Sequence, residues 1–212
     1  MKKLLSLVCG SFLLTSAAKA EMTFGVGFMA GQVSSSGTET EGTAADTSTR
    51  DKSFDEFFVG ADIFAEKELA NGVSIGVSYV PVDVELGSGK RTDSSTGADV
   101  ASEADTGTRT AKAELENLMT LYGNFPFGGN GSYALAGMHY TKVSTTETLP
   151  NSSYGDENIY GGLIGIGRKN GNRKIELFYS DFESINLTAT GGNTNKVTAD
   201  ADALTLRLSV GF

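Results

Sequence analysis

The sequence is poor in the residues that most often carry chemistry. It has one cysteine, one histidine, three prolines and no tryptophan among 212 residues. Cys9 lies in an N-terminal apolar run, where it matches a lipoprotein cleavage site poorly. Beyond residue 20 there is no cysteine for a disulfide or a thiolate. That part also lacks a run of the roughly 20 apolar residues that a transmembrane helix needs, so thiol chemistry and a helical membrane anchor are both excluded there.

The first 20 residues have the three parts of a secretory signal peptide. A basic start at Met1-Lys2-Lys3 is followed by an apolar run from Leu4 to Leu14 and by Ala18-Lys19-Ala20, an A-x-A cleavage pattern. The apolar run is too short to span a bilayer. The sequence therefore predicts a cleaved signal peptide over residues 1–20 and a single domain over residues 21–212.

The mature chain is strongly acidic. Removing Lys2, Lys3 and Lys19 leaves 17 − 3 = 14 basic residues against 26 acidic ones, a net charge of −12. A nucleic-acid partner is not expected, because binding to phosphates needs a basic surface.

The clear periodicity of the mature chain is two residues, which predicts β-strands. In the last segment, Leu204, Leu206, Leu208, Val210 and Phe212 alternate with polar or small residues. Similar patterns predict eight strands in all. They cover Met22 to Ala30, Phe57 to Glu66, Val73 to Tyr79, Ala113 to Phe125, Ser132 to Lys142, Tyr160 to Gly167, Lys174 to Ser180 and Leu204 to Phe212.

One of these strands has an irregular pattern and one an ambiguous one. In the strand from Ala113, the apolar face predicted from Leu115, Met119 and Leu121 is interrupted by Asn117. The strand from Ser132 to Lys142 has no clear phase.

The connections alternate between short and long. Lys67 to Gly72, Phe127 to Gly131 and Lys169 to Asn172 are short, and Asn170-Gly171 suits a type I′ turn. Four connections are long and rich in Ser, Thr, Gly and Asp: Val33 to Asp55, Gly87 to Ala111, Val143 to Glu157 and Asn186 to Asp202. This alternation is typical of an all-β, closed, antiparallel up-and-down transmembrane β-barrel with the short turns in the periplasm. Eight strands are expected, and ten if Gly87 to Ala111 hides a hairpin.

Aromatic residues at the strand ends fit two membrane interfaces. The set expected beside the periplasm is Phe24, Phe125, Phe127, Tyr133 and Phe212. The set expected at the opposite rim is Phe57, Phe58, Tyr79, Tyr140, Tyr160 and Phe182.

Taken together, these features resemble the small eight-stranded outer-membrane barrels of the OmpA/OmpX type over the whole mature chain. The resemblance rests on the signal peptide, on glycine-interleaved strands such as Phe24-Gly25-Val26-Gly27-Phe28 and Gly165-Ile166-Gly167, and on the terminal strand ending in Phe212. It implies a location in the outer membrane of a Gram-negative bacterium and transient recognition of the Phe212 strand by the barrel assembly machinery. Outer-membrane lipid and lipopolysaccharide are the other partners expected, and the barrel is expected to be monomeric.

Few residues are candidates for chemistry. His139 could act as a general base only beside a nucleophile and an orienting acid, and Thr141 is the hydroxyl expected on its strand face. Charged residues share the phases of the expected interior, where ion pairs are expected to plug a narrow lumen: Asp62, Glu66, Glu114, Glu116, Glu176, Lys112, Lys174 and Arg207. We therefore expect no catalytic, cofactor-binding or metal-binding residues, and no wide aqueous channel.

The long connections carry most of the acidic charge. They hold 14 acidic residues against six basic ones, so −8 of the net −12 lies there. The acidic residues are Glu39, Glu41, Asp46, Asp51, Asp55, Asp93, Asp99, Glu103, Asp105, Glu147, Asp156, Glu157, Asp200 and Asp202. No EF-hand-like spacing occurs, so solvated loops are favoured over a cation site.

The sequence thus predicts a non-enzymatic integral outer-membrane protein that anchors acidic surface loops for envelope integrity or surface interaction. An outer-membrane enzyme acting on lipid or protein and a narrow channel are the functional alternatives. A soluble periplasmic β-barrel is the alternative fold.

Overall fold

The computed structural model describes residues 22–43, 46–93, 107–148, 152–191 and 195–212. The predicted signal peptide and the acidic residues Asp99, Glu103 and Asp105 lie outside these ranges. No helix in the described ranges is long and apolar enough to cross a membrane.

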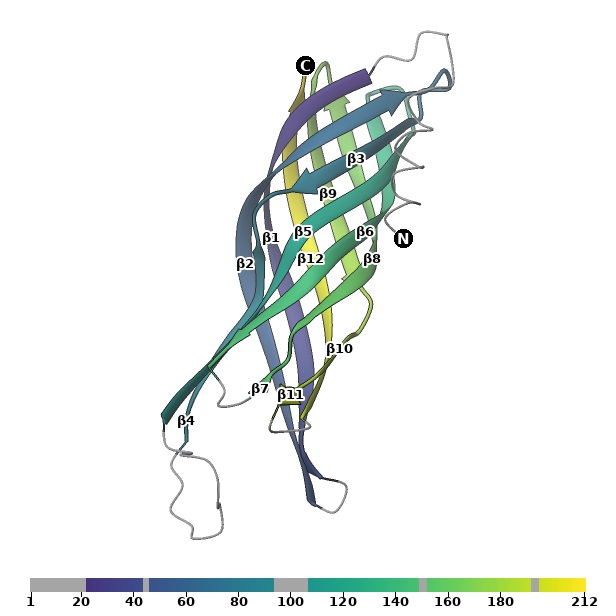
Figure 1. Cartoon of the computed structure of the whole chain (residues 1–212). Coiled ribbons are helices and arrows are strands. Elements are labelled where there is room, and N and C mark those ends of the chain that lie inside the picture. Colours follow the sequence, from purple (N-terminus) through teal and green to yellow (C-terminus); the bar gives the residue numbers. More distant parts are fainter. Residues whose placement is uncertain (1–21, 44–45, 94–106, 149–151, 192–194) are drawn as a thin grey trace.

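Eight antiparallel strands form a closed ring (Figure 1). Each strand pairs with the next in the order β1-β2-β3-β5-β6-β8-β9-β12, and β12 pairs with β1. The ring strands are β1 (Met22–Thr43), β2 (Asp46–Glu68), β3 (Ser74–Val80), β5 (Gly107–Pro126), β6 (Ser132–Glu147), β8 (Asp156–Asn170), β9 (Arg173–Phe182) and β12 (Lys196–Gly211). The predicted fold class, an eight-stranded closed barrel, is confirmed.

Closure joins the two chain ends, as the sequence pattern predicts. The β1–β12 ladder runs from Gly25 opposite Gly211 to Thr40 opposite Lys196. Four further strands are accessory: β4 (Val84–Asp93) pairs with β5, β10 (Ile185–Thr188) pairs with β12, and β7 (Ser152–Ser153) pairs with β11 (Thr190–Gly191). The hairpin suspected between Gly87 and Ala111 is thus formed by β4 and β5, but β4 extends the line of β3 and the ring keeps eight strands.

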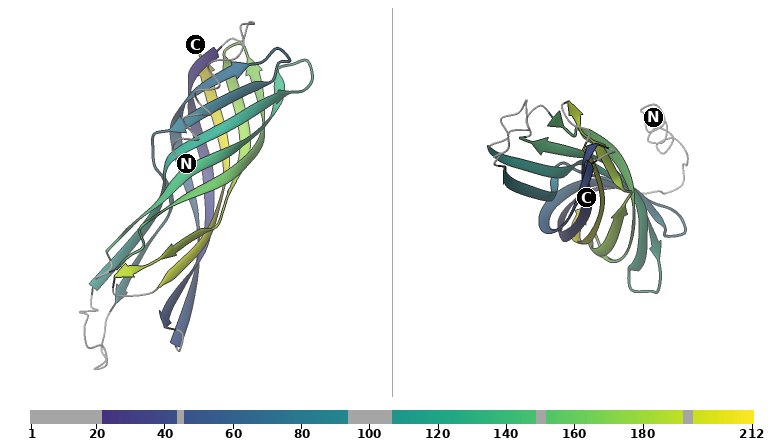
Figure 2. Two further views of the ribbon diagram at one scale, coloured as in Figure 1. Left: turned by 45° about the vertical axis from the view of Figure 1, so that its right-hand side comes forward. Right: turned by 90° about the horizontal axis from the view of Figure 1, so that it is seen from below.

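The two ends of the barrel differ (Figure 2). One end, which we call the turn end, contains the start of β1, the last residues of β12 and the short connections. In these connections Gly72, Gly128 and Gly171 have positive φ angles of 81°, 69° and 61°. Only glycine adopts such angles freely. The β8–β9 loop is Gly171-Asn172, one residue later than predicted, and Asn170 closes the strand instead of entering a type I′ turn.

The loop end, at the opposite side, corrects the sequence prediction. Most of the four long connections are strand: the β1–β2 ladder continues to Thr43 opposite Asp46, and the β4–β5 ladder to Asp93 opposite Gly107. These segments are rich in Thr and Ser, and threonine favours the extended backbone when a partner strand is present. The hairpins therefore project beyond the closed ring (Figure 1).

A β-bulge in β5 corrects a second prediction. Asn117 has a φ of 56°, and the β5–β6 register shifts between Glu116 and Met119. Asparagine tolerates this left-handed conformation better than most residues. The bulge reverses the phase, so Leu115 faces the lumen while Met119 and Leu121 face outward. Lys112, Glu114 and Glu116 consequently lie on the outer face rather than in the predicted interior.

The outer surface of the ring is apolar. Side chains such as Phe28, Ile63, Ile164, Leu206 and Leu208 are exposed there. On β9 and β12 every second residue is buried, so the polar members of each pair point into the lumen. An exposed apolar band around a closed barrel is suited to hydrocarbon, where closure also pairs the backbone groups.

The predicted aromatic sets are only partly right. Phe24, Phe125, Phe127 and Phe212 are exposed at the turn end, and Phe57, Tyr79, Tyr140 and Tyr160 point outward at the other rim. Tyr133, Phe58 and Phe182 instead point inward. Their alternation phase, not their place along the strand, determines which face they occupy.

Candidate functional site

The lumen near the turn end is filled by an ion-pair cluster. The Arg207 guanidinium donates to Asp62 from Nη2 over 2.6 Å and from Nε over 3.0 Å, and to Glu176 from Nη1 over 2.8 Å. Lys174 pairs with Glu66. The five side chains come from β2, β9 and β12 and are at most 6% exposed. All five were predicted to face the interior, so the structure brings this part of the predicted set together.

Tyrosines and an amide complete the ion-pair cluster. Tyr133 donates to Glu176 over 2.8 Å, while Tyr122 and Asn124 donate to Glu66 over 3.3 and 2.9 Å. Hydrogen bonds of this kind are what make a buried ion pair tolerable. The cluster spans five of the eight strands and leaves no wide aqueous path through this half of the barrel.

Glycines make room for the ion-pair cluster and its rings. A Cβ added at Gly76 would lie 2.4 Å from the Tyr122 ring, and one at Gly167 would lie 2.4 Å from the Tyr133 ring. A Cβ at Gly27 would lie 2.1 Å from the Asp62 carboxylate. The inward positions at these glycines therefore have no room for a side chain.

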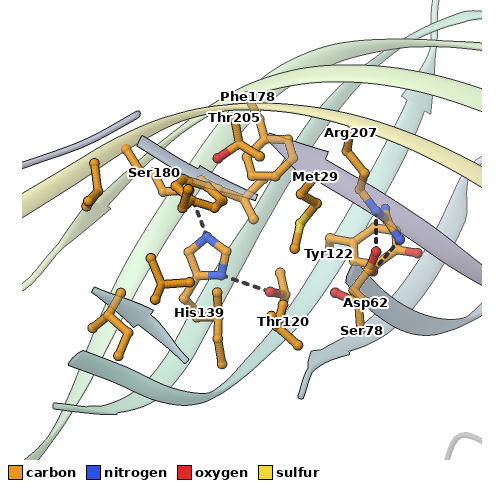
Figure 3. A pocket seen from close by; sticks show the side chains of 18 of the residues that line it. Met29, Asp62, Ser78, Thr120, Tyr122, His139, Phe178, Ser180, Thr205 and Arg207 are labelled. Atoms are coloured by element: carbon orange, nitrogen blue, oxygen red, sulfur yellow. Dashed lines mark hydrogen bonds and ion pairs between the residues drawn. The ribbon is translucent and has the colours of Figure 1, made fainter. Parts of the chain in front are cut away.

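His139 lies on the loop side of the ion-pair cluster, in a small inner cavity of about 60 Å³ (Figure 3). Its Nδ1 is 2.9 Å from the Thr120 hydroxyl and its Nε2 is 2.9 Å from the Ser180 hydroxyl. The imidazole stacks on Phe182 with 5.4 Å between ring centroids. Gly161, which lies between them in the β8 ladder, leaves the space for this stack.

Thr141 lies on the inner face of β6 with His139, as predicted, but no hydrogen bond joins the two side chains. Thr141 donates instead to the Glu116 carbonyl over 2.8 Å. Thr120 could have been found from the sequence, because it is the cross-strand neighbour of His139 once the β5 bulge is placed. Ser180 could not, since it reaches His139 across the intervening strand β8.

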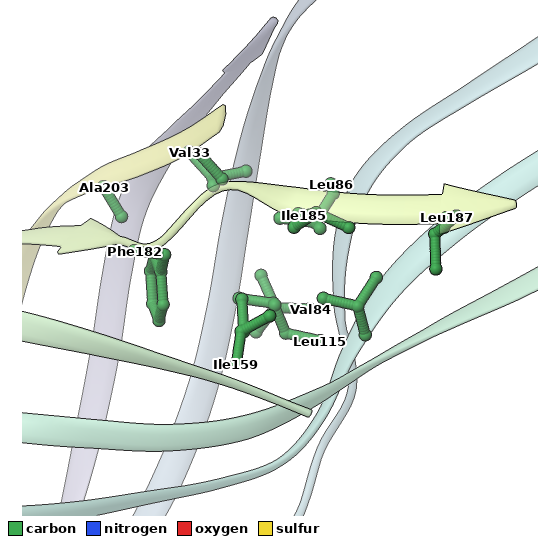
Figure 4. Packing of buried hydrophobic residues seen from close by; sticks show 11 residues of the cluster. Val33, Val84, Leu86, Leu115, Ile159, Phe182, Ile185, Leu187 and Ala203 are labelled. Atoms are coloured by element: carbon green, nitrogen blue, oxygen red, sulfur yellow. The ribbon is translucent and has the colours of Figure 1, made fainter. Parts of the chain in front are cut away.

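On the loop side of the inner cavity, apolar side chains close the lumen; we call them the collar (Figure 4). Its buried members are Val33, Val84, Leu86, Leu115, Val143, Ile159, Phe182, Ile185, Leu187, Ala201 and Ala203. The collar comes from eight strands and has no charged member, in contrast to the ion-pair cluster below it.

Beyond the collar lies an outer cavity of about 320 Å³ between the projecting hairpins. Leu86, Val143, Ile185 and Leu187 form its floor, so the collar separates the outer cavity from the inner one. The volume falls within the range of small-molecule sites, which is about 300–1,000 Å³. The inner cavity is well below that range.

The barrel wall has an unpaired seam beside the inner cavity. The β2–β3 ladder stops at Ile63 opposite Tyr79, and Pro81, which has no N–H, follows β3. The chain then enters β4, which pairs with β5 but not with β2 (Figure 1). We call this interval, between 57–62 of β2 and 80–84, the seam.

Side chains from both borders of the seam reach the inner cavity. Phe58 lines it from β2, and Val80 and Val84 line it from the other border. Toward the loop end, the Ser35 hydroxyl donates to the Leu86 carbonyl over 2.7 Å, so a luminal side chain takes the place of a strand partner. The described residues contain no group of three or more His, Cys, Asp or Glu side chains arranged to hold a metal ion.

Comparisons with known proteins bear on the fold. No protein-family model matches the sequence, and no curated protein matches it. The outer membrane protein OprG from Pseudomonas aeruginosa is similar in structure at 12% identity and a TM-score of 0.52, over 89% of this chain and 96% of OprG. The outer membrane protein AlkL, determined in lipid bilayers, is similar at 12% identity and a TM-score of 0.54, over 93% of each chain. This chain thus has the fold of small outer-membrane β-barrel proteins.

Proposed function

We propose that this integral outer-membrane protein takes small apolar molecules from the outside into the membrane through the seam in its wall. The observation that carries the proposal is the position of the seam. It lies beside the mostly apolar inner cavity, on the loop side of the half-barrel that the ion-pair cluster fills. A molecule that passes the collar meets the ion-pair cluster, and separating a buried ion pair costs about 3–5 kcal/mol. Sideways movement through the seam breaks no strand ladder.

The seam itself supports a functional role. The seam begins at Tyr79 on the outer rim, where the apolar side chains of Val59 and Val82 are exposed. Unpaired backbone groups are costly wherever hydrocarbon reaches them, and continuing the β2–β3 ladder for a few residues would remove that cost. Pro81 prevents this continuation. A barrel that served only as an anchor would gain stability from a complete wall.

A cross-link across the seam tests the proposal. The mature chain predicted from the sequence lacks cysteine, so Val59→Cys with Asp83→Cys places one thiol on each border. Joined by a short bifunctional thiol reagent, the pair should slow uptake of the apolar dye N-phenyl-1-naphthylamine into expressing cells at least fivefold. Leu121→Cys with Met138→Cys is the matched control, because those residues are already paired across a continuous ladder. Equal uptake in both cross-linked proteins would remove the proposal.

Conductance measurements test the channel alternative separately. Reconstituted protein should show no large, stable conductance in a planar bilayer, because the ion-pair cluster fills the lumen. Reproducible nanosiemens-scale pores would contradict the sealed half-barrel.

We also propose that the protein is not an enzyme. Ser180 and His139 are within hydrogen-bond distance, but Nδ1 of His139 faces the Thr120 hydroxyl where a triad has a carboxylate. The expected result for His139→Ala is unchanged lipid composition of the host outer membrane by mass spectrometry. A lipid species present with the native protein and missing with this variant and with Ser180→Ala would establish an enzyme instead.

The projecting β1–β2 hairpin favours a second role, the surface interaction or envelope support predicted from the acidic loops. Its ladder continues to Thr43 opposite Asp46, and its exposed acids include Asp51 and Asp55. Deleting residues 38–51 and joining the ends with Asn-Gly should keep a folded barrel that resists unfolding before boiling on a denaturing gel. If surface contact is the role, adhesion or detergent resistance of the cells falls while dye uptake persists.

A further inference from the structure

The outer cavity combines an apolar floor with a concentration of positive charge. On the side of the barrel lumen it is bounded by the collar residues Leu86, Val143, Ile185 and Leu187, with Val197 on the β12 side. A volume of about 320 Å³ holds roughly ten non-hydrogen atoms, at ~30 Å³ each, the share of a water molecule in the liquid. A short alkyl chain fits such a space.

The outer cavity is lined by more positive than negative side chains, although the chain as a whole is acidic. Five cationic residues line it, against two carboxylates, in a protein of net charge −9. The cationic residues are Arg50, Lys52, Lys90, Arg109 and Lys112. The charge of Lys112 is compensated by Glu85 and Glu114, at 3.5 and 2.7 Å.

The two carboxylates are already engaged by the cavity wall. Glu39 accepts a hydrogen bond from the Tyr154 hydroxyl over 2.7 Å, and Glu147 accepts one from the Tyr154 amide over 2.5 Å. Lys52, in contrast, forms no ion pair with any residue in the described ranges, whereas Lys90 lies on the outward face of the β4–β5 hairpin, opposite Thr110. Lys52 is two residues from Phe54 on β2 and so shares its strand face.

We propose that the outer cavity binds an amphipathic anion, with its alkyl chain on the collar and its acidic headgroup near Lys52. This inference rests on the proposed uptake function and names its cargo. Apolar burial supplies about 25 cal/mol per Å² and does not select a headgroup, whereas the cations favour an anion over a neutral or cationic analogue. Free alkyl carboxylates and anionic lipid chains share this chemistry.

Calorimetric titration of three matched ligands tests the inference. Octanoate, 1-octanol and octylammonium share one alkyl chain and differ in headgroup charge. The protein is placed in phosphatidylcholine nanodiscs, and empty nanodiscs give the partition background. Octanoate should bind at least about tenfold more tightly than the other two, equivalent to ~1.4 kcal/mol.

Charge reversal locates the site. Lys52→Glu should remove the preference for octanoate and leave octanol binding unchanged. Lys196→Glu is the matched control, because this lysine does not line the cavity and the net charge changes equally. Equal affinities for octanoate and octanol in the native protein, or the same loss in both variants, would overturn the inference.

Two further comparisons complete the test. Adding anionic phospholipid to the nanodiscs should compete with octanoate if a lipid is the natural occupant, and should have no effect beyond ionic screening if the cargo is a free anion. Equilibrium binding does not need the seam, so octanoate binding that persists beside failed dye uptake would reject only the proposed function. If the seam cross-link blocks dye uptake but the protein binds octanoate, 1-octanol and octylammonium equally well, only the anionic cargo would be rejected.

Discussion

The two halves of this barrel solve the filling of a narrow lumen in opposite ways. Toward the turn end, Arg207, Lys174, Asp62, Glu66 and Glu176 fill it with mutually paired charges. Toward the loop end the collar fills it with aliphatic side chains and leaves cavities on either side. The wall is continuous around the charged half, whereas the seam opens beside the apolar half. The buried ion pairs therefore lie in the half of the barrel with a continuous wall, and the apolar side chains lie in the half that contains the seam.

The largest effect should come from breaking the ion-pair cluster. Arg207→Ala leaves Asp62 and Glu176 buried without their cation, and the expected loss is about 3–5 kcal/mol in the free energy of unfolding. Urea unfolding in lipid vesicles measures this. Lys169→Ala is the control: its pair with Glu68 is about half exposed, so the loss should be about 0–1 kcal/mol. Similar losses for both variants would show that burial of the cluster does not matter.

The next effect tests the collar. Leu115→Ala removes a side chain that is 3% exposed and should cost about 2–5 kcal/mol, because the surrounding strands cannot close on the space. Leu206→Ala faces outward, where lipid fills the vacancy, so a smaller loss is expected. The same unfolding assay compares the two. A larger loss at Leu206 would place the main packing of this half outside the lumen.

A glycine pair sharpens the comparison between the inside and the outside of the wall. Gly76→Val drives a side chain into the Tyr122 ring and should cost about 1–3 kcal/mol. A Cβ added at Gly162 would meet no atom within 4 Å, so Gly162→Val should change stability by no more than ~0.5 kcal/mol. Heat-modified gel mobility and urea midpoints are the measurements, and equal midpoints would reject the tight lumen.

The smallest effect is a pH dependence at the loop side of the Tyr140–Tyr160 pair, outside the apolar band. Lys142 and the Ser144 hydroxyl hydrogen-bond to Glu116 and lower its pKa. A carboxyl whose pKa falls on folding stabilises the protein above its ordinary pKa, and the contribution is lost as the pH falls through the folded pKa. Glu116→Gln should therefore reduce stability slightly at neutral pH and not at strongly acidic pH. A constant difference across the pH range would exclude this pair as the cause.

The sequence predicts the ring well because the solvent constrains it. The alternation in β12 specifies both its lipid face and its luminal face, and Arg207 and Glu176 follow from the same rule. The loop end was underestimated, because Ser- and Thr-rich segments look like loops until a partner strand is present. The bulge at Asn117 was visible as an interruption, but its effect on Leu115 depends on a backbone angle that the sequence does not state.

The site was harder to predict than the ring. The contact between His139 and Ser180 spans a strand, and the seam arises from the register at which β2 and β3 part, so neither follows from local pattern. Pro81 was the available signal, since a proline beside a ring strand marks a break in its ladder.

The central claim is that β2 has no second partner strand along the seam, beside a half-barrel filled by the ion-pair cluster. Site-resolved amide hydrogen exchange in lipid bilayers tests this claim most directly. The two sections of β2 on either side of Ile63 share one strand and one neighbour, β1, and differ in the second neighbour. Every second amide from Phe57 to Asp62 should exchange at least about tenfold faster than the amides from Ile63 to Lys67, because the first group has no partner across the seam. Uniform protection along β2 would mean that the wall is complete, and it would contradict the account.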